Sequence, residues 1–389
     1  MVTSTNRTDL AYVAEVTPGT TPPAPAFQSL PVTGIGLQTE IATAVSEAIR
    51  NDRQIDDLVL VDENIQGSTP FELTFEAWSP LMIALLQGLP GVTASLSGSD
   101  VDVTQGTSTY SSAGTVNFSS LEPGMFVNIQ GFANAANNGP KEVVSSTATD
   151  LIVTDTGLVS QASGDPVTFE AASYRNGAEE AQAFTFRKGI SPAGGTESIF
   201  YFTGCEVSQM TFGFNTAEIL TATMDIMGLA SDATTTPIAG ETIVPVVNYS
   251  LMNSVTSVAS IDVGGLPAQT EFQSLNLTIN NNITGAKAIG TLGAFDLASF
   301  TLDATGDVEL YFEDLSAYNL FKQAGSFSLS IALKDAVGNC IVMSMPFCKF
   351  ETMEEPIPGK DQFLFQNGTF RALRDPVLDY MVQFDLIPA

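Results

Sequence analysis

A short segment of this chain occurs twice, and the repetition limits what the chain can fold into. The first copy runs from Phe71 to Gly88 and the second from Val308 to Gly325. Aligned without gaps, the copies share these residues: Glu72/Glu309, Leu73/Leu310, Phe75/Phe312, Glu76/Glu313, Ser79/Ser316 and Gly88/Gly325. Unrelated segments of this length would share roughly one residue. The chain is therefore predicted to contain a duplicated unit, which favours a self-assembling structural protein.

Each copy is predicted to form a strand followed by a helix. In the first copy, Phe71, Leu73 and Phe75 alternate with polar residues, which is typical of a half-buried strand. Ser79 and Pro80 are expected to open the helix, with serine as the N-cap and proline in the first turn. Ser316 stands at the corresponding place in the second copy.

The predicted fold is mainly β, with two tandem β-sandwich or barrel units, each with one flanking helix. A strand follows Gly325 at once, whereas a long segment rich in Ser, Thr, Gly and Val separates Gly88 from the comparable strand at Phe184. That segment is predicted to be an inserted small β-barrel or sandwich that projects outward, because an insertion must lie outside the host core. Its strands are expected near residues 115–118, 125–129, 142–145 and 150–154. The predicted domains are an N-terminal arm (1–28), a discontinuous first unit (29–90 and 173–229), the inserted domain (91–172), a linker (230–250) and a second unit (251–389).

The charge balance limits the partners of the chain. There are 43 acidic and 14 basic residues, no histidine, and a formal net charge of −29. Nucleic-acid binding depends on clustered Lys and Arg, so this surface should repel DNA and RNA. Charged residues make up only 15% of the chain, so uncharged polar residues must cover much of the surface. Such a surface suits a protein covered by copies of itself.

The sequence offers little for catalysis, so we expect no catalytic residues, no cofactor and no metal. The lack of histidine removes the Ser-His-Asp and Cys-His arrangements. Asp155-Thr156-Gly157 resembles the active turn of aspartic proteases, but those enzymes need two such turns and only one is present, so a hairpin turn is favoured. Residues 303–309 resemble a calcium loop but lack the glycine and glutamate that such a loop requires, which favours a polar turn.

The cysteines and the apolar runs indicate in which cellular compartment the chain folds. Cys205, Cys340 and Cys348 are odd in number and widely spaced, so we expect buried thiols in a reducing compartment. The N-terminal residues lack the apolar run of a signal peptide, and the longest such run, Leu81 to Leu89, is too short to span a membrane. The chain is expected to be soluble and not secreted.

Three regions are candidates for contacts. The arm is rich in Pro and Gly and is either a disordered tail or a segment that docks on a neighbour through Tyr12 and Val13. The polar span from Gln38 to Asp57 is unusually long for a connection, and such loops are usually functional or disordered. Its candidate contact residues are Glu40, Arg50, Arg53 and Asp56. The recurring acids of the repeat, Glu72 and Glu309 among them, form either a solvated edge or an acidic lining.

Several blocks resemble the major tail tube proteins of long-tailed phages and prophages. They are Ala11-Tyr-Val-Ala-Glu15 followed by Thr17-Pro-Gly-Thr-Thr-Pro22, then residues 46–54, 67–86 and 199–207. The resemblance covers most of the first half apart from the insertion, and the second half joins it through the internal repeat.

The resemblance implies β-sandwich units whose sheets join side by side into a ring with an inner β-barrel. Rings would stack into a hollow tube in the virion tail, assembled in the host bacterial cytoplasm, through which DNA passes as repelled cargo. The span 38–57 would reach the next ring, the arm would contact neighbours, and Glu72, Thr74, Glu309 and Tyr311 are the candidate lumen-lining residues. Other implied partners are tail proteins at the tube ends and a tape-measure protein in the lumen.

Most members of the family carry one unit and form hexameric rings, whereas this chain carries two. A homotrimer with pseudo-sixfold symmetry is therefore favoured over a homohexamer. The alternative function is a non-polymerising carbohydrate- or cell-surface-binding β-protein, such as an adhesin or a tail-associated binding module. A hydrolase that relies on carboxylates alone is a third interpretation.

Overall fold

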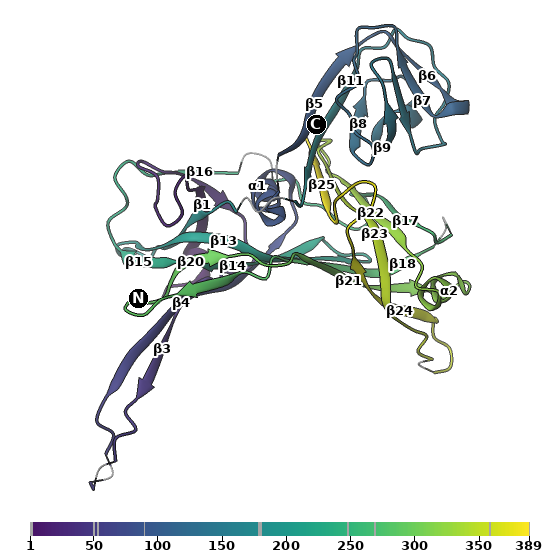
Figure 1. The fold of residues 1–389 in the computed structure, drawn as a ribbon. Coiled ribbons are helices and arrows are strands. Elements are labelled where there is room, and N and C mark those ends of the chain that lie inside the picture. Colours follow the sequence, from purple (N-terminus) through teal and green to yellow (C-terminus); the bar gives the residue numbers. More distant parts are fainter. Residues whose placement is uncertain are drawn as a thin grey trace.

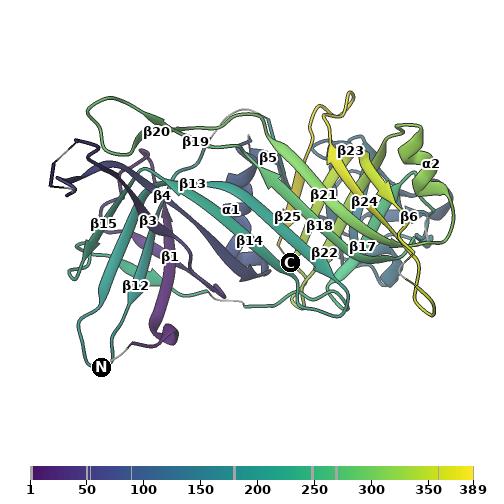
Figure 2. The same cartoon turned by 90° about the horizontal axis from the view of Figure 1, so that it is seen from below.

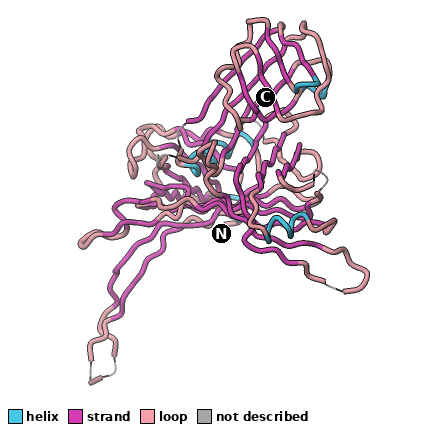
Figure 3. The backbone as a smooth tube through the Cα atoms, turned by 45° about the vertical axis from the view of Figure 1, so that its right-hand side comes forward, coloured by secondary structure: helices cyan, strands magenta, loops and turns pink. Residues whose placement is uncertain are grey.

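Two β-sandwich units and a third, smaller β domain make up the structure, a computed structural model (Figure 1). It describes residues 3–49, 51–52, 54–88, 90–177, 181–246, 249–267, 270–357 and 359–388. Figure 3 shows the two units side by side, with the smaller domain on one side and a long hairpin projecting from the other. Strands dominate within this part of the chain, as the sequence predicted.

The first unit combines segments from both sides of the insertion. Its elements are β1 (Thr8–Ala14), β2 (Ala26–Leu30), β3 (Gln38–Val45), β4 (Leu58–Glu72), α1 (Phe75–Leu86), β12 (Phe184–Ile190), β13 (Ser198–Asn215), β14 (Thr221–Gly228), β15 (Ala230–Thr234) and β16 (Thr242–Val244), after a 3-10 turn at Thr5–Arg7. The pairing order is β3, β4, β14, β13, β12, β1 and β2, all antiparallel. β15 pairs with the first part of β13.

The second unit repeats this order. Its elements are β17 (Val258–Gly264), β18 (Phe272–Asn280), β19 (Thr284–Lys287), β20 (Ala294–Ala298), β21 (Asp303–Tyr311), α2 (Ser316–Lys322), β22 (Phe327–Lys334), β23 (Cys340–Glu354), β24 (Phe365–Ala372) and β25 (Gln383–Ile387). The pairing order is β18, β21, β24, β23, β22 and β17, and β25 pairs with β23 as β15 pairs with β13. The two halves therefore share one topology, with β2 and β16 as additions to the first.

The structure shifts the register of the repeat by two residues. The Leu73 N–H donates to the Leu220 carbonyl, and the Phe312 N–H donates to the Leu364 carbonyl, each at 2.9 Å. Phe312, not Leu310, therefore holds the place of Leu73. Because side chains alternate with a period of two along a strand, the shift leaves every residue on its predicted face.

The two units form one continuous sheet. The second part of β13, Gln209–Asn215, pairs with β14 on one edge and residue by residue with β18 on the other. Figure 2 shows β4, β14, β13, β18, β21 and β24 side by side, with α1 behind them. The apolar face carries the main core, in which Phe71, Phe212 and Leu277 lie in one cross-strand row.

Helix α1 starts earlier than the sequence predicted. Thr74, not Ser79, is the N-cap residue, and Pro80 lies inside the helix, where it has no N–H to donate to the preceding turn. The Trp78 ring stacks on Phe71 with 3.5 Å between ring centroids, and both side chains are buried. This contact places Trp78 one turn into a helix that begins at Phe75. The Ser79 hydroxyl donates to the Phe75 carbonyl and does not cap the helix.

The inserted domain runs from β5 to β11 and has a core of its own. Its elements are β5 (Pro90–Gly98), β6 (Val101–Thr104), β7 (Thr109–Ser112), β8 (Phe126–Gln130), β9 (Gly139–Ser146), β10 (Asp150–Val153) and β11 (Val167–Arg175), with 3-10 turns at Gln105–Thr107 and Ala135–Asn137. The predicted strand at 115–118 is wrong, since these residues form bends and loop. β5 and β11 pair with each other, and β11 also pairs with β25 of the second unit.

Three segments expected to be arm, linker or turn are parts of the sheets. β1 of the predicted arm lies between β12 and β2, and Arg187 of β12 pairs with Asp9 at 2.8 Å, with Glu197 at 2.9 Å and with Glu241 at 3.1 Å. β15 and β16 lie in the predicted linker, since β15 is the last strand of the first unit's repeat. Residues 303–309, expected to be a turn, belong to β21. Local composition does not reveal these strands because their partners are distant in sequence.

We expect Trp78→Ala to lower the free energy of unfolding by about 3–5 kcal/mol, because it removes the largest fully buried side chain and leaves a cavity against Phe71. Urea unfolding followed by circular dichroism measures the change. Val377→Ala is the control, since Val377 is 85% exposed and its truncation should change the free energy by less than about 0.5 kcal/mol. Equal stability of the Trp78→Ala and control variants would contradict the assigned core.

Candidate functional site

The face of the continuous sheet opposite α1 is polar across both units. One cross-strand row runs from β4 to β23 through Glu72, Thr221, Gly213, Asn276, Asp307, Thr369 and Thr352. The next row on the same face contains Pro70, Thr223, Thr211, Thr278, Thr305, Arg371 and Lys349. We call this surface the polar face. Strands β4, β14 and β13 of the first unit and β18, β21, β24 and β23 of the second unit contribute to it.

Neighbouring side chains of the polar face bond to one another. The Thr211 and Thr278 hydroxyls lie 3.1 Å apart, and the Asn276 amide donates to Asp307 at 2.7 Å. Arg371 donates to Glu351 at 2.6 Å and pairs with Asp303, and these two bonds raise the pKa of its guanidinium. The main cation of this surface is thus neutralised by its own neighbours. Apart from Lys349, which has no ion pair among the described residues, the polar groups of this surface are hydroxyls, amides and carboxylates, which offer little to a phosphate.

The predicted lumen residues have different places. Glu72 and Glu309 lie on the polar face, and the Tyr249 hydroxyl donates to Glu72 at 3.2 Å. Tyr311 lies at one end of that face, packs against Phe363 and Phe365, and donates to Gln273 at 2.7 Å. Thr74 has no exposed surface, because it lies under the start of α1. Thr74 therefore cannot line an accessible surface, and we remove it from the set.

The span from Gln38 to Asp57 belongs to a long hairpin formed by β3 and β4, which projects away from the body (Figure 1). A cluster of exposed apolar residues covers it: Ile41, Val45, Ile49, Ile55, Leu58, Val59, Leu60 and Val61. Glu40 is exposed and accepts from Gln66 at 2.8 Å, and Asp56 is also exposed. Arg50 and Arg53 lie outside the described residues. An apolar hairpin of this kind is typical of a surface that a partner covers.

The arm residues proposed as contacts are mostly internal. Tyr12 is buried, with its ring centroid 5.5 Å from that of Phe184, and burial raises its pKa to about 12. Val13 is half-buried and packs on the small cluster around Phe27. The side chains of β1 serve the fold of this chain, so Tyr12 is wrong as a contact with another subunit.

The second unit has a shorter hairpin, β19–β20, that lies against the first unit. Its Lys287 ammonium pairs with Asp62 and donates to Asn64 at 2.8 Å, and the bond from Lys287 lowers the pKa of Asp62. Close approach to Glu63 occurs at Gly293, whose φ of +75° favours glycine. This contact could not be predicted from the sequence, since the paired residues lie far apart along the chain.

Glu206 of β13 also lies at this contact, and its carboxylate is poorly satisfied there. It is 7% exposed, one of its carboxylate oxygens has no partner among the described residues, and it faces the negative charge of Asp296 on β20. Burial, aided by Asp296, raises the pKa of Glu206 to about 7. Two acids therefore face each other where the second hairpin meets the first unit.

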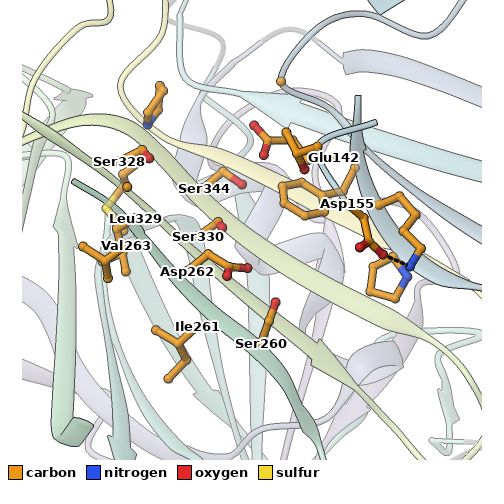
Figure 4. A pocket seen from close by; sticks show the side chains of 18 of the residues that line it. Glu142, Asp155, Ser260, Ile261, Asp262, Val263, Ser328, Leu329, Ser330 and Ser344 are labelled. Carbon is orange, nitrogen blue, oxygen red and sulfur yellow. Dashed lines mark hydrogen bonds and ion pairs between the residues drawn. The ribbon is translucent and has the colours of Figure 1, made fainter. Parts of the chain in front are cut away.

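A groove of about 810 Å³ lies between the inserted domain and the second unit (Figure 4). Ser260, Asp262, Ser330 and Ser344 line its floor, and Glu142 of β9 faces them. Burial raises the pKa of Glu142, and the charge of Asp262 adds to the effect. Asp155, in the turn that resembles an aspartic-protease motif, pairs with Lys141 and accepts from the Gly157 N–H at 2.7 Å. The groove offers hydrogen-bonding groups, but its described residues hold no paired nucleophile and base.

The described part of the chain shows neither a metal site nor a membrane-spanning helix. It contains no cluster of three or more Cys, Asp or Glu residues arranged to hold a metal ion. Neither α1 nor α2, nor any other described helix, has the length and apolar character needed to cross a membrane. The three cysteines are buried free thiols, and burial raises the pKa of Cys340 to about 11 and that of Cys348 to about 12.

Two β units joined in one sheet, with an exposed apolar hairpin, are typical of a structural protein whose surface a partner covers. The profile of the phage tail tube protein family matches residues 5–372. The chain therefore belongs to the phage tail tube family, which confirms the family inferred from the sequence blocks. It is a structural component of the virion tail. A comparison with curated proteins found no match.

We expect Glu206→Gln to reduce the pH dependence of stability. An unfolded chain releases this proton near pH 4.5, whereas the folded chain keeps it until about pH 7, so the free energy of unfolding falls as the pH rises between these values. The variant should gain stability relative to the wild type at pH 8 but not at pH 4. Urea titrations across this range measure the effect. Asp296→Asn should reduce the slope less, and parallel curves for wild type and Glu206→Gln would refute the assignment.

Proposed function

We propose that this chain is the tube subunit of a long-tailed phage and polymerises as stacked rings around a lumen lined by the polar face. Family membership supports the tail tube role, and the continuous sheet shared by two units is the observation that carries the ring geometry. Each chain supplies two units, so three chains supply the six units of a ring. A homohexamer is the alternative arrangement.

We propose that neighbouring chains pair with each other in the way that β13 pairs with β18 inside one chain. β23 is the counterpart of β13, since each has one extra residue at a bulge, Ser208 and Glu351, followed by the aligned pairs Gln209/Thr352 and Met210/Met353. The second part of β13 has partners on both edges, whereas Lys349–Glu354 of β23 pairs only with β24 among the described residues. β23 therefore offers an open edge where β13 holds β18.

The complementary open edge lies in the first unit. β18 of the second unit corresponds to the residues that lead into β3 of the first unit. Thr278 pairs with Thr305 in the second unit, as Gln38 at the start of β3 pairs with Gln66 in the first. Upstream of Gln38, the Gly36 N–H donates to the Ser68 carbonyl at 2.9 Å, so this segment also follows β4. Its other edge has no strand partner among the described residues. Pairing this edge with β23 of a neighbouring chain repeats the internal joint and satisfies both edges, and repetition closes a ring.

The polar face is proposed to line the lumen. It presents acids such as Glu72, Asp307 and Glu309, while Arg371 is held by its acidic neighbours. Such a surface would not bind phosphates, so DNA could slide during ejection, with repulsion screened beyond about 8 Å at physiological salt. The inserted domain lies on the opposite side of the sheet and would decorate the exterior (Figure 1).

The remaining partners follow from this role. We propose contacts with other tail proteins at the tube ends and with a tape-measure protein in the lumen, after assembly in the host cytoplasm. The non-polymerising carbohydrate-binding alternative lacks a comparable explanation for the shared polar face and the open edges.

A symmetry-resolved electron cryomicroscopy reconstruction of the native tail, or of tubes formed by purified protein, should show three chains per ring with pseudo-sixfold density around the lumen. Six identical chains per ring would refute the pseudo-symmetry and leave the tube role intact. Protein that stays monomeric at high concentration, from a particle without a tube of this chain, would contradict the tube role itself.

We expect the double variant Asp307→Lys/Glu309→Lys to form tubes that retain DNA, because it places clustered cations on the polar face. Wild-type tubes should retain none at about 150 mM salt, and retention by the variant should fall steeply as salt increases. Filter binding with labelled DNA measures this. Asp102→Lys, which adds positive charge on the inserted domain, is the exterior control. Retention by the control but not by the double variant would contradict the proposed lumen.

A further inference from the structure

The two hairpins of this chain are structural counterparts in different situations. Ala44↔Val59 and Val45↔Leu58 in β3–β4 match Thr284↔Ala298 and Gly285↔Leu297 in β19–β20. One step further out, the Ser46 N–H donates to the Asp57 carbonyl at 3.0 Å, where Ala286 pairs with Asp296. Asp57 therefore holds the place of Asp296. β19–β20 lies across the first unit of its own chain (Figure 2), whereas β3–β4 projects from it.

The contact of β19–β20 with the first unit shows which kind of partner surface the projecting β3–β4 hairpin does not contact within its own chain. Asn281 is 3% exposed, and its amide donates to the carbonyls of Leu85 and Val207. Its counterpart in the first unit is Ile41, one residue beyond Glu40, as Asn281 is one beyond Asn280. Ile41 is 62% exposed. A position that is buried in one copy is thus open in the other, which is expected if a second chain covers it.

At the contact within the chain the aspartate faces an acid, whereas at the corresponding position of the second unit the facing residue is a lysine. Glu206 and Cys205 precede the bulge of β13 as Lys349 and Cys348 precede that of β23, so Lys349 holds the place of Glu206. Within the chain, Asp296 therefore faces an acid, whereas the counterpart Asp57 would face a lysine. Lys349 is half-buried, lies with its ammonium 5.9 Å from the centre of the Phe347 ring, and has no ion pair among the described residues.

We infer that the paired part of the β3–β4 hairpin docks on the second unit of another copy in the same ring, with Asp57 against Lys349 and Ile41 buried beside β23. This contact differs from the expectation that the span 38–57 reaches the next ring. This inference rests on the proposed ring and names its electrostatic contact. The covalent link between units lets the internal contact tolerate two facing acids. The contact between chains has no such link, and an opposite-charge pair there both attracts the correct partner and sets the register.

A charge exchange tests the pair. Lys349→Glu and Asp57→Lys should each raise the protein concentration needed for tube assembly by about tenfold, because each places like charges at every joint between chains. The double variant should return this concentration to near the wild-type value. Lys322→Glu, on α2 of the same unit, is the control for charge alone and should assemble normally. Sedimentation and negative-stain microscopy measure assembly, and circular dichroism checks that each variant folds.

A cross-link distinguishes contacts within a ring from contacts between rings. Asp57→Cys/Lys349→Cys protein, assembled and treated with a short bis-maleimide, should give linked species no larger than the number of chains in one ring. The native cysteines are buried and should not react. The double-cysteine variant does not rely on the charge pair, so it remains informative if either charge variant fails to fold.

The outcomes separate the inference from the proposed function. Restoration by the double charge variant together with ring-sized cross-links supports the pair. Tubes that form normally with either single charge variant, or cross-links that extend beyond one ring, would overturn the docking and leave the tube role standing. Wild-type protein that forms no rings at all would overturn both.

Discussion

Backbone hydrogen bonding between β13 and β18 is the interaction on which this structure depends. It joins two copies of one unit into a single sheet, so that side chains from both line up in shared cross-strand rows. The apolar rows meet in one core, and the polar rows form one surface. Because strand pairing uses main-chain groups, the joint does not require identical side chains. This explains how the copies diverged in sequence and still kept one topology.

Part of this architecture could be predicted from the sequence, because period-two alternation and the repeat are local signals. These signals predicted a mainly β chain, which the structure confirms. The start of α1 could not be predicted, since Ser79-Pro80 is a strong local N-terminal signal and the stacking of Trp78 on Phe71 overrides it. The strand β1 was not predicted because one of its two partners, β12, lies beyond the whole insertion, and the other, β2, follows a segment rich in Pro and Gly that is typical of an arm.

The candidate site was predictable only where alternation alone decided the outcome. Thr74 alternates correctly with its neighbours, yet the strand ends before it and the helix covers it. The contact between Lys287 and Asp62 joins hairpins from different units, and no spacing in the sequence links them. The two-residue shift between sequence repeat and strand register shows the same limit. Aligning the two copies by identical residues pairs Leu73 with Leu310, whereas aligning them by their hydrogen bonds pairs Leu73 with Phe312.

The paired strands β5 and β11 have a consequence for how such a chain can change. They bring the two ends of the insertion together, since Gly98 lies opposite Val167 and Thr93 opposite Ala172. The insertion also keeps a separate core around Phe169 and Tyr110. A module with adjacent ends and its own interior can be exchanged or lost in evolution without rebuilding its host. Phages could thus vary this module freely while the sheet shared by the two units stays the same.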